Sequence, residues 1–303
     1  MKKSTKIWSI IAASLMLVGI IIFSGVMTML NWDFKKLSTV RYETNSYEIG
    51  ESYANISIKT STADITVLPS EDGTTRVVCY EQINIKHSVS VKDDTLCIEV
   101  KDTRKWYEYI GINFGFSQKV TVYLPRGDYG NLTVNLSTGD TRVADNFNFD
   151  SINISASTGD ISVNNTTANS IWIKTTTGDI ALSNINCQGE ITTSLSTGDV
   201  MMSNVNCGTV TSNGSTGDLR MSEVIANNKI YITRSTGDIT LGKCDANEIY
   251  IKVSTGNVTG TLLSDKIFIA TTDTGNVSVP HSGNGGRCEI RSSTGDITIM
   301  VQK

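Results

Sequence analysis

Apolar and polar residues alternate along most of the chain, around a glycine that returns every 19 or 20 positions. Apolar side chains stand seven and five residues before this glycine and two and four residues after it, as in Ile171, Ile173, Ile180 and Leu182 around Gly178. A period of two is typical of strands with one buried and one solvated face. Each repeat is therefore expected to be one β coil, with a strand on either side of a Thr-Gly-Asp corner.

The corner tetrad Ser-Thr-Gly-Asp, or a close variant of it, occurs nine times. Its glycines are the predicted structural turns: Gly139, Gly159, Gly178, Gly198, Gly217, Gly237, Gly256, Gly275 and Gly295. This period is typical of solenoids, in which stacking buries the apolar face that no single coil can bury. The pattern predicts an all-β chain whose residues 127–303 form a β-solenoid, or β-helix, of about nine or more coils of 19–20 residues. A further apolar residue is expected in its core seven positions after the glycine: Ile185, Val205, Val224, Cys244 and Leu263.

The same template begins earlier in the chain, with Ala63 in the glycine slot. Ala63 lies 76 residues before Gly139, or four times 19, so the stretch between them holds either three degenerate coils or strand hairpins inserted after a first coil. We assign residues 51–126 to an N-terminal β coil followed by elaborated or degenerate β structure. Alternation predicts strands at residues 76–80, 88–91, 95–100 and 119–124.

Residues 106–116 are the most aromatic stretch of the chain. Such a segment can cover the open end of a solenoid, which repeat proteins need for solubility, or it can form a binding loop. The residues considered for either role are Trp106, Tyr107, Tyr109, Phe114 and Phe116.

The N-terminus has the pattern of a membrane segment. Lys2, Lys3 and Lys6 precede the 24 uncharged residues Ile7–Leu30, which are long enough to cross a bilayer. The positive-inside rule predicts a cytoplasmic tip at residues 1–6, a single transmembrane signal anchor at residues 7–30 and an extracellular remainder, starting with a polar spacer at residues 31–50. A cleaved signal peptide is the alternative, but its apolar core is usually shorter.

Composition agrees with this picture. The chain has 25 glycines and 3 prolines, and none of the prolines lies between Arg126 and Val279, as expected for a stack of paired strands that needs every backbone N–H. Without the three N-terminal lysines, 23 basic residues face 30 acidic ones, so the external part carries about −7. This balance predicts no nucleic-acid partner. The 2 histidines, His87 and His281, nearly exclude mechanisms that need clustered histidines.

The aspartates that follow the corner glycines share one register and form a file along one edge of the predicted solenoid. One interpretation is a ladder of calcium sites, because carboxylates about 4.8 Å apart repel by roughly 1 kcal/mol even in water. The other is capping, in which each side chain accepts hydrogen bonds from nearby backbone N–H groups. We favour capping, because Asn257 and Asn276 occupy the same slot without the charge. The candidate calcium ladder is Asp140, Asp160, Asp179, Asp199, Asp218 and Asp238.

Nothing in the sequence points to catalysis or to a cofactor. The serine and threonine before each glycine, such as Ser157 and Thr158, have no recurring His or Lys beside them, so they are expected to form hydroxyl ladders and turn hydrogen bonds. The aspartates could lie at glycosidase-like separations, but no pair stands out from the others. We therefore expect that the protein is not an enzyme.

The six cysteines have no metal-site spacing. Cys187 and Cys207 both lie nine residues after their glycines, so they would stack on neighbouring coils and could form a disulfide outside the cell. Cys244 and Cys288 stand in apolar slots, where small buried hydrophobes are expected. Pairing of Cys79 with Cys97 stays open.

Several segments together resemble a known family. They are the lysine-flanked N-terminal anchor, the early coil Ile56–Val67, the Val-Thr-Val-Tyr-Leu-Pro segment at Val120–Pro125 and the serial Ser-Thr-Gly-Asp coils. The sequence resembles, over about residues 50–303, the bacterial membrane-anchored β-strand-repeat family of unknown function labelled "putative adhesin". The resemblance implies a β-solenoid at the bacterial cell envelope, with some relatives associated with envelope-stress systems, and it brings no catalytic residues.

Two function classes follow from these patterns. The preferred one is a non-enzymatic, membrane-anchored extracellular module that binds an envelope protein or a wall or host polysaccharide. The alternative is an envelope-stress sensor or regulatory accessory protein whose partner is another membrane protein. In both cases the chain contacts the lipid bilayer through one helix and is located at the cell membrane.

Overall fold

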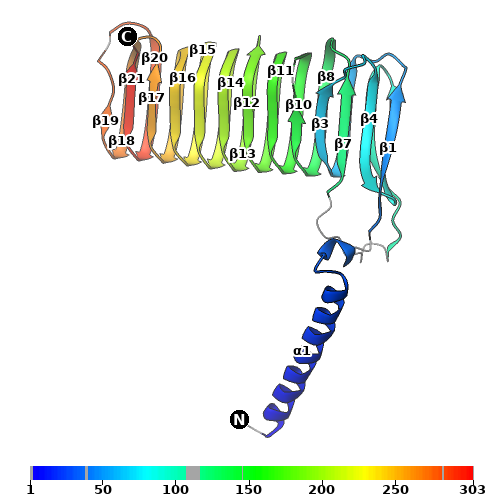
Figure 1. The fold of residues 1–303 in the computed structure, drawn as a ribbon. Helices are drawn as coiled ribbons and strands as arrows, with labels where there is room; N and C mark the ends of the chain where they lie inside the picture. The colour runs from blue at the N-terminus through cyan, green and yellow to red at the C-terminus, as the bar shows by residue number, and fades with distance from the viewer. Residues whose placement is uncertain (1–2, 38–39, 107–116, 145, 282, 303) are drawn as a thin grey trace.

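The computed structural model describes residues 3–37, 40–106, 117–144, 146–281 and 283–302. An N-terminal helix, α1 (Lys3–Met29), is followed by a short 3-10 helix, η1 (Phe34–Leu37), and by a stack of strands (Figure 1). α1 is long and apolar enough to cross a membrane, a property that membrane anchors and signal sequences share. The mostly β fold confirms the predicted β-solenoid.

The strands lie in two sheets, which we call sheet I for the strands before the corners and sheet II for those after them. Four long strands, β11 (Ile161–Thr177), β14 (Val200–Thr216), β15 (Leu219–Thr236) and β16 (Ile239–Thr255), lie with their first halves in sheet II and their second halves in sheet I. The other strands of sheet I, in their order along the stack, are β5 (Ile85–Lys92), β6 (Thr95–Asp102), β2 (Asn55–Thr62), β8 (Asp128–Thr138), β10 (Phe147–Thr158), β13 (Glu190–Thr197), β20 (Gly286–Thr294) and β18 (Lys266–Thr274). Those of sheet II are β1 (Tyr42–Ile49), β4 (Thr75–Gln82), β7 (Lys119–Leu124), β3 (Asp64–Pro69), β9 (Thr141–Val143), β12 (Ile180–Cys187), β17 (Val258–Leu262), β21 (Ile297–Val301) and β19 (Val277–Ser278).

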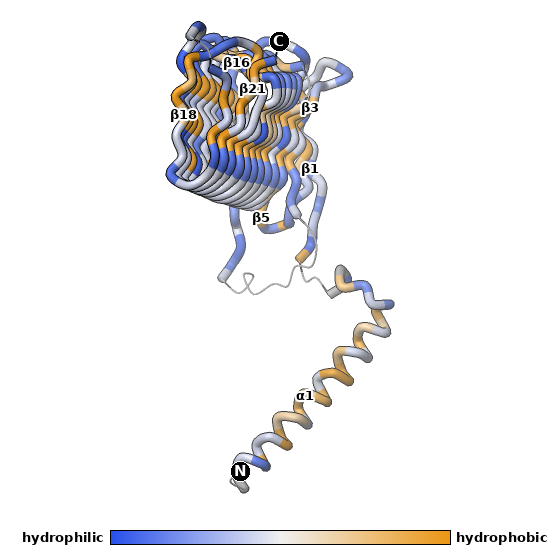
Figure 2. The backbone as a smooth tube through the Cα atoms, turned by 90° about the vertical axis from the view of Figure 1, so that its left-hand side faces the viewer, coloured by the Kyte–Doolittle hydropathy of each residue, from blue (hydrophilic) through white to orange (hydrophobic). Residues whose placement is uncertain are grey.

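The core lies between the two sheets. The predicted apolar slots before and after each corner are buried, as at Ile171, Ile173 and Ile180, and successive coils place them in register, so that rows of one hydropathy run along the stack (Figure 2). One slot differs from the prediction. Leu263 is exposed and Leu262 takes its place, because the pairing of β16 with β17 shifts register between Leu241 and Cys244.

Each corner requires glycine for two reasons. The nine tetrad glycines have φ between 126° and 150°, a conformation that L side chains rarely adopt. A Cβ at any of them would also lie within 2.3 Å of the carbonyl oxygen of the neighbouring corner. Ala63 occupies the corner position of the first coil in the sequence, and its backbone φ is not positive.

Strands β11, β12, β14, β15 and β16 each have a residue of positive φ six positions after the corner glycine, where the strand bends. Asparagine occupies this bend in three successive coils, at Asn165, Asn184 and Asn204, as expected from its tolerance of the left-handed region. The side-chain Nδ2 of Asn184 donates to Oδ1 of Asn165, and that of Asn204 donates to Oδ1 of Asn184, each at 2.8 Å. A second polar ladder therefore runs along the stack.

The coils do not stack in sequence order at the C-terminal end. The last coil, β20 and β21, lies between the coil that ends in β17 and the coil of β18 and β19 (Figure 1). Both edges of the last coil are paired, and its apolar residues Cys288, Ile290, Ile297 and Ile299 are buried.

The N-terminal end uses a similar insertion. β2 and β3 pair directly with β8 and β9 on one side and with β6 and β7 on the other. The stretch between Ala63 and Gly139 therefore holds hairpins and one degenerate coil instead of three coils, with strands β4 to β7 close to the predicted positions. Antiparallel strands extend both sheets beyond this coil: β5 in sheet I, and β4 with β1 in sheet II. Because β1 spans Tyr42–Ile49, the spacer expected at residues 31–50 is about half as long as predicted.

Candidate binding face and buried polar cluster

The file of corner aspartates makes its hydrogen bonds between coils. The backbone N–H of Asp179 donates to Oδ1 of Asp160 at 2.8 Å, and the same bond recurs from coil to coil at 2.7–3.2 Å. Asn257 replaces the carboxylate with an amide oxygen, which accepts the N–H of Asp296 at 2.9 Å. The side chain in this slot thus caps the next coil along, a geometry that asparagine supports as well as aspartate.

The same file does not gather metal ligands. Within the described part of the chain, no corner aspartate belongs to a group of three or more His, Cys, Asp or Glu side chains whose donor atoms lie within 4.8 Å of one another. At one place a protein cation joins neighbouring carboxylates, because Arg220 lies 3.4 Å from Oδ2 of Asp199 and 2.7 Å from Oδ2 of Asp218. Calcium binding stays a prediction for experiment.

All six cysteines are free thiols in this structure. Cys187 and Cys207 lie in neighbouring coils, and each thiol contacts a backbone carbonyl, of Asn169 for Cys187 and of Ile225 for Cys207. Burial raises the pKa of Cys207 to about 12. The disulfide between them stays a prediction, which requires oxidation of two shielded thiols.

The structure tests neither of the two roles predicted for the aromatic segment at residues 106–116. Tyr107, Tyr109, Phe114 and Phe116 lie outside the described residues, and Trp106, the one that is described, has an exposed side chain. The N-terminal end of the stack is extended by β1, β4 and β5.

The outer face of sheet I carries a row of residues six positions before each corner. From one coil to the next along the stack, this row runs Trp172, Thr192, Thr211, Tyr231, Tyr250, Glu289 and Ile269. Tyr231 and Tyr250 stack with their ring centroids 5.0 Å apart and their planes 8° apart. At Tyr231 the row therefore changes from the hydroxyls of Thr192 and Thr211 to two aromatic rings, which the carboxylate of Glu289 follows.

We call the surface around these two rings the tyrosine patch, formed by Lys229, Tyr231, Glu248, Tyr250, Lys252, Arg287, Glu289 and Arg291. The Lys229 ammonium lies 5.1 Å from the centroid of the Tyr231 ring. Glu289 is held between Arg287, at 2.5 Å, and Arg291, at 2.6 Å, and both arginines are more than half exposed. A shallow hollow opens beside Tyr250, lined by Lys229, Glu248, Arg287 and Glu289. Sequence reasoning missed this patch because the inserted last coil is what places the two arginines beside Tyr250.

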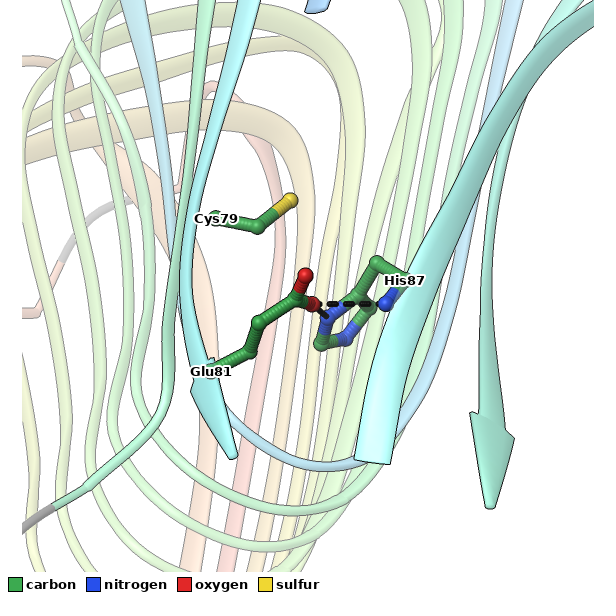
Figure 3. Close-up of side chains that lie close together, drawn as sticks. All are labelled: Cys79, Glu81 and His87. Carbon is green, nitrogen blue, oxygen red and sulfur yellow. Dashed lines mark hydrogen bonds and ion pairs between the residues drawn. The ribbon is translucent and has the colours of Figure 1, made fainter. Parts of the chain in front are cut away.

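A second group of polar side chains is buried in the N-terminal end of the stack. Cys79 and Glu81 point inward from β4 and His87 points inward from β5, so the three side chains meet between the two sheets (Figure 3). Oε2 of Glu81 accepts two hydrogen bonds, from the backbone N–H of His87 at 2.6 Å and from Nδ1 of its ring at 2.7 Å. All three residues are almost completely shielded from solvent.

A further shell of hydrogen bonds orients this cluster. Nδ2 of Asn45 donates to Oε1 of Glu81 at 2.8 Å, and Thr60 Oγ1 lies 3.0 Å from Nε2 of His87. Burial, followed by the nearby Glu81 carboxylate, raises the pKa of the Cys79 thiol to about 12. A thiol held in its protonated form and shut off from solvent is a poor nucleophile, so the arrangement does not resemble an active catalytic cysteine.

The cluster was not predicted, although the sequence holds part of its signal. Cys79 and Glu81 are two residues apart, so they share a face if the strand predicted at residues 76–80 continues to Glu81, and His87 directly precedes the strand predicted at residues 88–91. The sequence alone cannot place β4 and β5 in different sheets, which is what turns the three side chains toward one another.

Arg234 is a charged side chain buried in the stack itself, in a slot three residues before the corner. Its Nη2 donates to Oγ of Ser212 at 3.1 Å, and its guanidinium fills the space above Gly214, where a Cβ would lie 1.9 Å from Nη1. Burial lowers the pKa of Arg234 to about 10. The pair of Gly214 and Arg234 preserves core volume across two coils.

These features define a class of protein: a two-sheet β-solenoid with inserted terminal coils, preceded by an apolar helix. The chain belongs to the Toastrack DUF4097 family, whose model matches residues 53–189 and 188–303. This match confirms that the chain belongs to a family of the kind that the sequence resembles.

Solved structures include several similar chains. A "putative adhesin" from Bacteroides fragilis NCTC 9343 is 16% identical, with 86% of this chain and 97% of that chain covered and a TM-score of 0.45. A "putative lipid binding protein" from Parabacteroides distasonis ATCC 8503 is 15% identical, with coverages of 88% and 98% and a TM-score of 0.39. A "putative adhesin" from Parabacteroides merdae ATCC 43184 is 11% identical, with coverages of 88% and 98% and a TM-score of 0.39. No curated protein matches the sequence.

Proposed function

We propose that this protein is a non-enzymatic binding module at the bacterial cell surface, anchored by α1 and exposing its solenoid outside the cell. Three lysines before the apolar segment of α1 and the length of that segment support an anchor with a cytoplasmic N-terminus. The solenoid supports a rigid scaffold, because each coil is bonded to its neighbours along both sheets.

The observation that carries the proposal is the tyrosine patch on the outer face of sheet I. Stacked rings, exposed arginines and a hollow occur together on adjacent coils, whereas the corresponding positions of β13 and β14 hold no aromatic or basic residue; they are Glu190, Thr192, Ser194, Thr209, Thr211 and Asn213. Four basic residues face two acidic ones in the patch, on an external part that is acidic overall. This local excess of positive charge favours an anionic ligand.

We infer that the ligand is an extended anionic polysaccharide lying along the row of coils. The parallel strands repeat about every 4.8 Å, so a chain molecule can meet the same kind of contact from coil to coil. Hydrogen bonds between arginine and carboxylate groups are among the stronger polar contacts, and they suit uronic-acid polymers.

Binding of the full chain in detergent micelles to immobilised polygalacturonate, with neutral dextran as the comparison, tests this proposal. Replacing Arg287 and Arg291 by Gln should weaken binding about tenfold or more, a change of about 1.4 kcal/mol per decade. Lys174→Gln is the matched control, since this residue lies in the same row as Arg291 but several coils away. Equal binding by the arginine variant, or cleavage of the polymer, would contradict the proposal.

The role of the anchor can be separated from that of the patch. A surface binding module should keep its binding when Ile7–Leu30 is replaced by an unrelated membrane helix, because the patch does not depend on the helix sequence. Loss of function with retained binding would instead favour a regulatory protein that acts through its own helix.

A further inference from the structure

The cluster of Cys79, Glu81 and His87 has no part in the binding face, and its composition is unusual for its position. Glu81 is 0% and His87 is 2% exposed, inside an otherwise apolar region that includes Val77 and Val120. Burying polar or charged groups there costs free energy, and apolar residues of similar volume often serve stability as well or better. The retained polar residues therefore point to a role other than packing.

The donor atoms of the three side chains match a transition-metal site. One sulfur, one carboxylate oxygen and one imidazole nitrogen lie within 4.8 Å of one another, and within the described chain this is the one such group. Zinc binds sulfur at about 2.3 Å and nitrogen or oxygen at about 2.0–2.2 Å, so its ligand atoms lie at most roughly 4.5 Å apart. Small side-chain movements suffice, during which the 2.7 Å contact between Glu81 and His87 opens to admit the ion.

The surrounding hydrogen bonds are those that orient metal ligands. A histidine that binds through one ring nitrogen usually donates the other N–H to an oxygen acceptor. Here Thr60 Oγ1 lies 3.0 Å from Nε2 of His87, which leaves Nδ1 facing Glu81 and Cys79. Asn45 holds Oε1 of Glu81 and leaves Oε2 facing the cluster. In His87 and in Glu81, the polar atom that does not face the cluster is thus held by a hydrogen bond, which orients the proposed ligand atom.

We propose that Cys79, Glu81 and His87 bind one divalent transition-metal ion of the zinc class, through Sγ, a carboxylate oxygen and Nδ1. A fourth position is open to water, as in other sites with three protein ligands. Sulfur and imidazole disfavour calcium and magnesium, which take oxygen ligands. Binding displaces the thiol proton of Cys79, so uptake of the ion releases a proton.

The position of the site suggests what the ion does. β4 and β5 are consecutive in the chain but belong to different sheets, and they pair only at Gln82 and Ile85 beside their turn. An ion held by two residues of β4 and one of β5 joins the sheets where the N-terminal end of the stack would otherwise open. It acts as a closing clip and raises the stability of β1, β4 and β5.

The direct test uses the full chain in detergent micelles, stripped with EDTA and then given one equivalent of Zn²⁺ or Co²⁺. We expect one zinc ion per chain by native mass spectrometry, a rise in melting temperature, and a thiolate-to-cobalt charge-transfer band with Co²⁺. The wild-type measurement decides by itself, because absence of the band and of stoichiometric zinc overturns the proposal.

Variants identify the ligands. Cys79→Ser and His87→Gln should each remove the cobalt band and weaken zinc binding by at least about 100-fold, since loss even of an orienting partner costs 10–100-fold. Cys288→Ser is the matched control, because Cys288 is equally buried and its pKa is likewise raised to about 12 by burial. A band that persists in Cys79→Ser, or that disappears in Cys288→Ser alone, contradicts the assignment. Circular dichroism confirms that each variant is folded.

Discussion

The repeated stack and the N-terminal end of the solenoid are stabilised in different ways. In the stack, residues 128–301, each coil repeats the same glycine corner and the same apolar slots, and an aspartate or asparagine side chain caps the next coil along. At the N-terminal end, residues 42–124, the strands are partly antiparallel and the contacts around Glu81 and His87 occur once. At the N-terminal end, no neighbouring coil repeats a contact, so nothing compensates for its loss. In the stack, the loss of stability caused by a substitution depends on how closely the neighbouring coil packs against the substituted residue.

The largest effect is expected in the stack, from Gly198→Ala. The new Cβ would lie 2.2 Å from the backbone oxygen of Gly178, at a φ of 136°. Backbone strain and overpacking together should lower the free energy of unfolding by about 4 kcal/mol. Urea unfolding measures the loss. Gly127→Ala is the control, since nothing lies within 4 Å of a Cβ there, and an equal loss in both variants would show that the corner is not special.

The next effect separates the N-terminal end from the stack. His87→Ala in EDTA-treated protein leaves the buried Glu81 without its ring partner and should cost about 3 kcal/mol. Hydrogen exchange should accelerate in β1, β4 and β5 and remain slow in β13 to β16. His281→Ala should change neither quantity, because His281 is exposed. Uniform acceleration along the whole stack would show that the two regions unfold as one unit.

A smaller effect is expected for the aspartate file. Asp179→Ala removes the acceptor of the Asp199 N–H and should cost about 1 kcal/mol, whereas Asp179→Asn should be nearly neutral because asparagine fills the same slot at position 257. Thermal melting of the two variants gives the comparison. Equal losses in both would mean that the charge, and not the hydrogen bond, is what the slot needs.

Calcium should have the smallest effect on the stack. Since capping already satisfies the carboxylates, the melting temperature should be the same with and without millimolar calcium. A rise of many degrees that disappears on mutation of the file would reinstate the calcium ladder.

The reactivity of the cysteine thiols compares the two regions without any substitution that changes the stability of the protein. Burial raises the pKa of Cys79, Cys207 and Cys288 to about 12, so at pH 8 these thiols are almost entirely protonated and unreactive in the folded state. Alkylation followed by mass spectrometry should therefore modify Cys97, which is only partly buried, first. Early modification of Cys207 would indicate local opening of its coil.

The sequence by itself determined the repeat, its corners and its core. The period of 19 or 20 residues sets the coil length, and the alternation around each glycine decides which side chains are buried. These are local properties, because a positive-φ corner and a two-residue period depend on the residues that form them. The apolar segment at residues 7–30 can be recognised from the sequence for the same reason, because its length and lack of charge do not depend on contacts with the rest of the chain.

Only the tertiary structure decided which coils touch. Insertion of β20 and β21 between two earlier coils brings Arg287 and Arg291 beside Tyr250, and the separation of β4 from β5 into different sheets brings His87 to Cys79 and Glu81. Coils with nearly identical edges can pair in more than one order, so the repeat pattern does not specify their neighbours. The order depends on the sum of contacts along the stack, and the tyrosine patch exists only in that order.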